Sequence, residues 1–300
     1  MNRFATFISL LLLLGCSDGS SDEKPKTMAG IIDAAGPADW REPNPEQTLY
    51  MLLESGTVVF ELAPEFAPNT VENVLTLVAN RYFDGLSINR VQENYVVQWG
   101  DPQAGTPQRR IHELGDTLTA EFYRDAQGLD FVTLESRDAY AEQVGFVSGF
   151  PAGNDGSRAW LTHCYAMLGV GRDIAADSGN GTELYVVIGH APRHLDRNVT
   201  LIGRVIHGME LLTTLPRGGA QLGFYETAGE RVPIQAIRMA SDVPESQRIP
   251  VELLRTDTPT FQNLVESRRN RQEEWFVDPA GRIGICNVPL PARLIRPDDN

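Results

Sequence analysis

The feature that most constrains the fold is a series of short strand-like runs between residues 48 and 240, among which only two segments have helical spacing. The runs are rich in β-branched and aromatic residues and are bounded by Gly, Pro, Asn or Asp, as is typical of short strands. The clearest runs are 48–63, 87–98, 184–188, 200–206 and 232–239. The helical segments are 68–85 and 208–215. A mainly β chain with two separated helices predicts a barrel or a sandwich with helical caps, and the pattern does not choose between the two.

Two regions fit this pattern less well. Residues 123–162 are polar, contain glycine and have no single periodicity, so they predict an insertion. Residues 241–300 predict a C-terminal extension, with a charged helix over 260–275 and a short strand near 283–287. We interpret this extension as an appendage to the main domain and not as a second catalytic unit.

The first sixteen residues have the composition of an export signal. Arg3 is followed by an uncharged apolar run, Phe4 to Leu14, which is shorter than the about 20 apolar residues that a membrane-spanning helix needs. Leu-Leu-Gly-Cys16 resembles a bacterial lipobox, in which the cysteine receives the lipid anchor. The alternative is a plain signal peptide. Because Ser17 and not Asp follows the cysteine, the lipoprotein sorting rule favours the outer membrane over the inner one.

The segment after the signal and the overall charge bear on partners. Residues 17–47 are rich in Ser, Asp, Pro and Gly and predict a flexible tether between the membrane and the folded part. The formal net charge of -14 argues against nucleic acid as a partner, because phosphate binding needs basic patches. We therefore expect a lipid-anchored, monomeric protein on the periplasmic side of a bacterial envelope.

Two cysteines remain if Cys16 carries lipid. Cys164 and Cys286 would then lie in a compartment that permits disulfides, and they either form one or remain two buried thiols. A metal site is not expected, since two isolated cysteines and five scattered histidines show no ligand spacing.

Two blocks of sequence resemble a known family. Residues 61–102 are ELAPEFAPNTVENVLTLVANRYFDGLSINRVQENYVVQWGDP, and residues 180–210 are NGTELYVVIGHAPRHLDRNVTLIGRVIHGME. In this order they resemble the two halves of a cyclophilin-type peptidyl-prolyl cis/trans isomerase, over residues 48–240 with the insertion between them. The resemblance implies a closed eight-stranded antiparallel β-barrel capped by two helices.

The resemblance also implies site residues. Arg90 matches the catalytic arginine, and Gln98 matches the glutamine that holds it. Six further positions match the substrate pocket: Tyr95, Val96, Glu183, Tyr185, His194 and Leu195. The implied substrates are proline-containing exported polypeptides.

The chemistry of proline isomerisation explains these residue types. Rotation about an X–Pro bond breaks amide resonance against a barrier of about 18–20 kcal/mol. A guanidinium that donates to the prolyl nitrogen, which regains a lone pair in the twisted state, stabilises that state over both planar forms. Apolar side chains would hold the pyrrolidine ring. The reaction needs no metal, nucleotide or covalent intermediate, so no cofactor is expected.

Several positions depart from the family pattern. Ile88 and Asn89 replace Phe-His, Glu183 replaces a glutamine, and Gly169 lies roughly where an asparagine binds the peptide backbone. These changes keep an alternative open, namely a peptide-binding or chaperone/scaffold lipoprotein on the same fold with little catalysis. The retained Arg90 and Gln98 favour the isomerase.

Overall fold

The structure is a computed structural model that describes residues 27–295 except 105, 107, 110–113 and 116. The predicted signal, the Cys16 that is predicted to carry a lipid and residues 17–26 of the predicted tether lie outside the described residues. Within the described part, no helix has the length and apolar character needed to cross a membrane.

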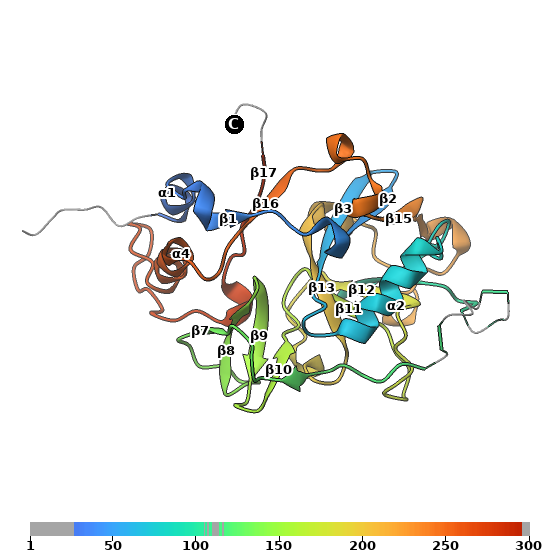
Figure 1. Cartoon of the computed structure of the whole chain (residues 1–300), viewed down its shortest axis with the longest axis horizontal. Coiled ribbons are helices and arrows are strands. Elements are labelled where there is room, and N and C mark those ends of the chain that lie inside the picture. Colours follow the sequence, from blue (N-terminus) through green and yellow to red (C-terminus); the bar gives the residue numbers. More distant parts are fainter. Residues whose placement is uncertain (1–26, 105, 107, 110–113, 116, 296–300) are drawn as a thin grey trace, which may run out of the picture.

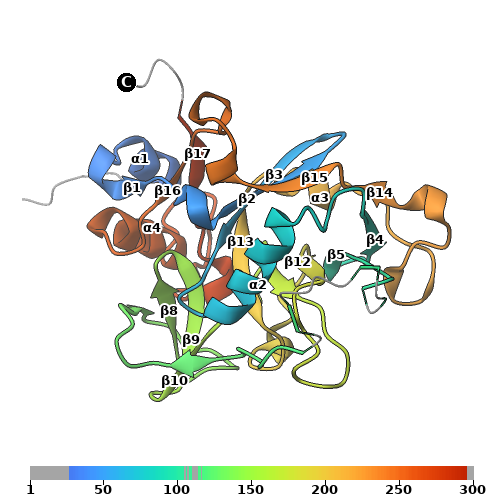
Figure 2. The same ribbon diagram turned by 45° about the vertical axis from the view of Figure 1, so that its right-hand side comes forward.

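The main body is a strongly curled antiparallel sheet of nine strands (Figures 1 and 2). The hydrogen-bonded order is β14-β4-β5-β12-β11-β13-β3-β2-β15. In chain order the strands are β2 (Thr48–Leu53), β3 (Gly56–Leu62), β4 (Ser87–Val91), β5 (Val96–Gly100), β11 (Met167–Val170), β12 (Glu183–Val187), β13 (Leu201–His207), β14 (Val232–Pro233) and β15 (Ala236–Met239). The prediction of a mainly β fold is confirmed.

The expected closed barrel of eight strands is not observed, because the hydrogen-bonded sheet has nine strands and two edges. Residues 232–239, expected as one strand, form two short strands at opposite ends of the hydrogen-bonded order. The partner changes at Ile234, whose N–H donates to Leu86 O, and at Gln235, whose N–H donates to Leu52 O. Pro233 cannot donate a ladder hydrogen bond, which confines its strand to an edge. The result is a nine-strand half-barrel whose two edges are consecutive in the chain.

Both predicted helices are present. Helix α2 (Pro68–Ala79) begins with a proline in its first turn, where the missing N–H costs nothing, and it packs against β15. Helix α3 (Met209–Thr213) follows Gly208, which adopts a positive φ of 80°, and packs against β3. Short 3-10 helices lie at Pro37–Asp39, Pro45–Gln47, Arg193–Leu195, Gln221–Gly223, Ala228–Glu230, Ala240–Asp242, Glu245–Gln247 and Ile285–Asn287.

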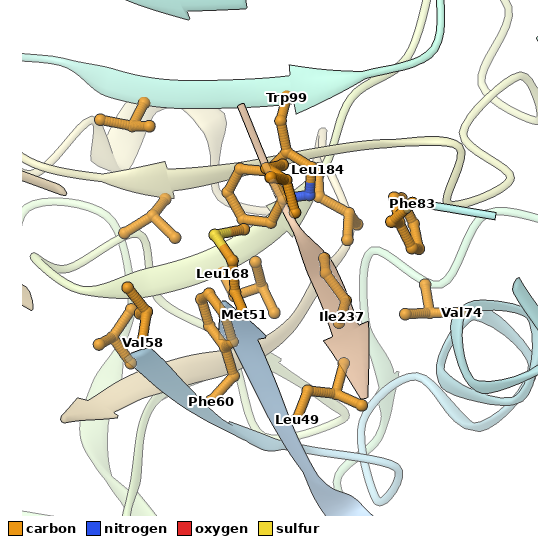
Figure 3. Packing of buried hydrophobic residues seen from close by; sticks show 14 of the residues in the cluster. Leu49, Met51, Val58, Phe60, Val74, Phe83, Trp99, Leu168, Leu184 and Ile237 are labelled. Carbon is orange, nitrogen blue, oxygen red and sulfur yellow. The ribbon is translucent and has the colours of Figure 1, made fainter. Parts of the chain in front are cut away.

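The first hydrophobic core fills the inside of the curled sheet (Figure 3). Trp99 is only 1% exposed, and its ring centre lies 5.9 Å from that of Phe60. Val74 reaches the same core from α2, and Ile237 reaches it from β15. Trp99 is therefore a core residue.

The predicted insertion is a folded sheet. Its five strands are β6 (Arg124–Asp125), β7 (Val132–Leu134), β8 (Gln143–Val147), β9 (Phe150–Asn154) and β10 (Arg158–Leu161). They pair in the antiparallel order β6-β10-β9-β8-β7. Val144, Phe146 and Trp160 are buried. The polar composition of this region concealed these strands because its apolar positions are few and separated by turns.

The two ends of the described chain also pack together. Helix α1 (Met28–Asp33) lies beside α4 (Pro259–Arg269), and β1 (Trp40–Arg41) joins β16 (Val251–Leu254) and β17 (Ala292–Leu294) in a three-stranded sheet (Figures 1 and 2). Residues 28–47, expected in the flexible tether, are thus folded, because Ile31 and Trp40 are buried. The predicted helix over 260–275 ends at Arg269, and a 3-10 helix replaces the strand expected near 283–287.

A second hydrophobic core joins these additions to the main sheet. Phe146 of the inserted sheet and Phe261 of α4 meet edge to face at 5.1 Å. Val96 and Tyr185 of the main sheet belong to the same core. A disulfide between Cys164 and Cys286, 122 residues apart, fastens the extension to the main domain. Of the two alternatives for these cysteines, the structure contains the bridge.

Reduction of this disulfide is expected to lower the free energy of unfolding by about 2–5 kcal/mol, because it releases a closed loop of more than 100 residues in the unfolded chain. Urea unfolding of the oxidised and reduced protein measures the difference. A Cys164→Ser/Cys286→Ser double variant serves as the control, since it should match the reduced protein and ignore the reductant. Equal unfolding midpoints for oxidised and reduced wild type would contradict the prediction.

Candidate active site

Arg90 on β4 and Gln98 on β5 face each other in the antiparallel register. Arg90 Nη1 donates to Gln98 Oε1 at 2.9 Å, Nε donates to Leu222 O at 2.7 Å, and Nη2 donates to Gln92 Oε1. The guanidinium carbon also lies 5.5 Å from the centre of the Tyr95 ring. Contacts at all three nitrogens hold the guanidinium plane in one orientation.

Glu183 on β12 extends this chain of contacts by one residue. Gln98 Nε2 donates to Glu183 Oε2 at 3.0 Å while its Oε1 accepts from Arg90. An ionised carboxylate can only accept, so it determines which way the Gln98 amide points. Glu183 therefore orders Gln98 and, through Gln98, Arg90. Gln98 thus lies between Glu183 and Arg90 and bridges them.

These residues line a cavity of about 310 Å³. Seven of the eight predicted site residues line it: Arg90, Tyr95, Val96, Gln98, Glu183, Tyr185 and Leu195. The eighth, His194, is exposed and does not line this cavity. The 3-10 helix Arg193–Leu195 explains the difference, because successive side chains of so tight a turn point to different sides. The predicted substrate contact of His194 is therefore not supported.

The expected position of Gly169 is also corrected. Gly169 pairs with Tyr185 across β11 and β12, and a Cβ on it would lie 2.3 Å from Tyr185 Cζ. The residues at the cavity are instead Gly171 and Arg172. Arg172 was not among the predicted site residues, because the sequence analysis assigned the matching position to Gly169. The pairing of Val170 with Leu184 gives the correct register.

Phe224 packs against the Arg90 guanidinium, as Tyr95 does, and the sequence did not predict this contact. The ring centre of Phe224 lies 5.4 Å from the guanidinium carbon, on a turn that also supplies the carbonyl of Leu222. No periodicity or motif marks residues 218–224 in the sequence, so only the three-dimensional structure brings them to the site.

Burial shifts the pKa of two charged groups in the site, Glu183 and Arg90. It raises the pKa of Glu183 above 4.5, an effect partly opposed by the hydrogen bond from Gln98. It lowers the pKa of Arg90, which nonetheless remains protonated at neutral pH. The site therefore holds a positive donor beside an apolar slot, with a carboxylate behind the donor.

The comparison with protein families agrees with this geometry. The model of the family described as cyclophilin type peptidyl-prolyl cis-trans isomerase/CLD matches residues 48–241. This match covers more than half of the chain, and the chain belongs to the cyclophilin-type peptidyl-prolyl isomerase family.

Curated bacterial relatives match a shorter stretch. One from Staphylococcus saprophyticus, named "Putative peptidyl-prolyl cis-trans isomerase", is 38% identical over 82 residues, which are 27% of this chain and 41% of the relative. A protein of the same name from Staphylococcus haemolyticus is 43% identical over 54 residues, 18% of this chain and 27% of the relative. This chain thus spans less than half the length of these relatives.

A solved structure matches nearly the whole chain. The cyclophilin AquaCyp293 from Hirschia baltica superposes with a TM-score of 0.68 at 23% identity, over 89% of this chain and 97% of its own. The superposed part, 89% of this chain, is longer than residues 48–241, which the family model matches. The shared fold therefore extends beyond these residues into the N-terminal segment or the C-terminal extension.

The raised pKa of Glu183 predicts the effect of Glu183→Gln on stability. Because the folded state binds this proton more tightly than the unfolded state, ionisation of Glu183 destabilises the folded protein as the pH rises. The variant should melt at a higher temperature than wild type at pH 7, and the gap should close as the pH falls below 4.5. Thermal melts from pH 3 to 8 test this, with the exposed Glu142→Gln as the control. A gap that widens on acidification would contradict it.

Proposed function

We propose that this chain catalyses the cis/trans isomerisation of X–Pro peptide bonds. One observation carries the proposal: a guanidinium held at three nitrogens lies at the edge of a cavity that has apolar and aromatic walls. A positive donor beside apolar and aromatic side chains suits the twisted prolyl amide.

The arrangement of Arg90 suggests how the barrier is lowered. Three of the five N–H groups of its guanidinium are engaged by Gln98, Gln92 and Leu222, which leaves two for a substrate. A donor that is already oriented does not have to reorganise when the prolyl nitrogen becomes pyramidal and exposes its lone pair. The interaction is stronger with the twisted amide than with either planar amide, and only that difference accelerates rotation.

The walls of the cavity would bind the substrate ring. Val96 and Tyr185 are nearly fully buried and belong to the second hydrophobic core, so they form a rigid base. Tyr95 and Leu195 line the more exposed part of the cavity. A pyrrolidine ring packed among them would leave the flanking peptide free to rotate.

Arg90→Ala is expected to reduce kcat/KM for an Ala-Pro-containing peptide by about 100-fold to 1000-fold, the usual effect of removing one oriented donor. A protease-coupled or NMR exchange assay measures it. Arg158→Ala, which removes a half-buried arginine of the inserted sheet, is the control and should keep full activity. Equal activity of wild type and Arg90→Ala would exclude the mechanism. A folded wild type with no activity would favour the peptide-binding or scaffold lipoprotein.

We further propose that the protein acts in the bacterial envelope as a lipid-anchored folding factor for exported polypeptides. The lipobox-like sequence ending in Cys16 supports an anchor. The Cys164–Cys286 disulfide supports an oxidising compartment, where such bridges persist. Slow X–Pro isomerisation limits the folding of many exported chains, which gives such an enzyme substrates.

Cys16→Ser is expected to abolish incorporation of radiolabelled palmitate and to release the protein from the membrane fraction. Ser17→Asp is the matched variant, since it should keep the label and move the protein from the outer to the inner membrane. Palmitate labelling of the Cys16→Ser variant, or a soluble wild type, would contradict the anchor.

A further inference from the structure

A buried chain of hydrogen bonds runs from the cavity to the inserted sheet. The Tyr185 hydroxyl lies 2.9 Å from His163 Nε2, and His163 Nδ1 lies 2.9 Å from Asp196 Oδ1. Arg193 then connects Asp196, at 2.5 Å from its Nε, with both carboxylate oxygens of Asp138 at 2.9 Å. Asp138 belongs to the inserted segment, between β7 and β8.

The chemistry of this chain determines where each proton lies. Burial lowers the pKa of His163, whose side chain is completely buried, so its imidazole is neutral and has one donor and one acceptor. The Asp196 carboxylate accepts from Nδ1–H, which leaves Nε2 as the acceptor. The Tyr185 hydroxyl therefore donates to Nε2. This donation defines the direction of the hydroxyl and, with it, the position of the ring.

Close packing against Gly169 also fixes the position of the Tyr185 ring. A Cβ on Gly169 would lie 2.4 Å from the Tyr185 hydroxyl, so the ring and hydroxyl occupy the volume that a side chain would need. Packing at Gly169 and the hydrogen bond to His163 hold Tyr185 from two directions. No other hydrogen bond of the hydroxyl is present among the described residues.

Both additions to the family fold attach at this point. The inserted sheet reaches His163 through Asp138, Arg193 and Asp196. The C-terminal extension reaches the next residue along the chain, Cys164, through its disulfide with Cys286. Two consecutive residues therefore connect the wall of the cavity to the insertion and to the extension.

We propose that His163 is a positioning residue that holds Tyr185 in its substrate-binding position, and that the inserted sheet steadies it through Asp138. The proposal rests on the isomerase function proposed above, because it assigns Tyr185 to the proline pocket. Loss of the hydrogen bond between His163 and Tyr185 loosens one wall of the pocket, both in the ground state and in the transition state. It should raise KM with little change in kcat.

The test is a double-mutant cycle of Tyr185→Phe and His163→Leu. Each variant should raise KM for a proline peptide by about threefold to tenfold, the effect of one hydrogen bond, with kcat within about twofold of wild type. The double variant should be no worse than the poorer single variant, since both remove the same contact. His163→Gln retains a polar group and should partly restore KM. Tyr185→Phe keeps the ring, so it remains informative if His163→Leu does not fold.

A second pair of variants tests the link to the insertion. Asp138→Asn weakens the pairing with Arg193 and should raise KM in the same direction by a smaller factor. Glu142→Gln changes an exposed carboxylate of the same segment and should leave KM unchanged. A KM that is unaffected by Asp138→Asn would overturn the role of the insertion.

Peptide affinity separates failure of this proposal from failure of the proposed function. The dissociation constant of a proline peptide, measured by NMR titration, should rise in Tyr185→Phe as KM does. Variants that are less stable but keep wild-type KM and affinity would show a merely structural His163 and overturn the proposal. A wild type without turnover, whose peptide affinity still falls in Tyr185→Phe, would reject the isomerase and retain the positioning role.

Discussion

Strand β5 lies between β4 and β12, and its two ladders decide which side chains meet in the pocket. The pairing with β4 sets Gln98 opposite Arg90, and the pairing with β12 sets it opposite Tyr185. Side chains two residues apart lie on the same face, so Val96 and Gln98 both reach the cavity while Val97 and Trp99 enter the first core. A shift of one residue in either ladder would exchange these faces and bury Arg90 or expose Trp99.

The second core gives this arrangement its stiffness. Burial of each Leu or Phe side chain contributes about 1.5–3 kcal/mol to the free energy of unfolding. The many apolar side chains that join the inserted sheet, α4 and the back of the pocket therefore contribute more together than the disulfide, which contributes about 2–5 kcal/mol. The additions are therefore held mainly by packing, and the disulfide and the buried polar chain through His163 define where they attach. An unpaired group in that chain would be costly at such depth, which explains why each member has a partner.

Much of the site could be predicted because its residues occur in two continuous blocks. Arg90 and Gln98 are eight positions apart, a separation that the β4–β5 pairing turns into direct contact. The helices at 68–79 and 209–213 follow from apolar spacing and from Pro68 and Gly208. The family match over residues 48–241 has nearly the predicted bounds.

Other features depend on contacts between distant segments, which no local pattern reveals. The inserted sheet has short strands in a polar stretch, and α1 and β1 are stable only because the extension covers Ile31 and Trp40. His163 carries no motif, since its partners Tyr185 and Asp196 lie 22 and 33 residues away. His194 is the converse case, in which a position that matches the family motif lies inside a tight turn, is exposed and does not line the cavity.

The most direct test of the account is the crystal structure of the oxidised protein with a bound Ala-Pro-containing peptide. The account predicts the pyrrolidine ring against Val96, Tyr185 and Leu195, with an Arg90 N–H directed at the prolyl nitrogen and the Tyr185 hydroxyl still on His163. A peptide bound elsewhere, such as in the larger groove of about 940 Å³ that Arg41 and Arg255 line between the three sheets, would contradict it.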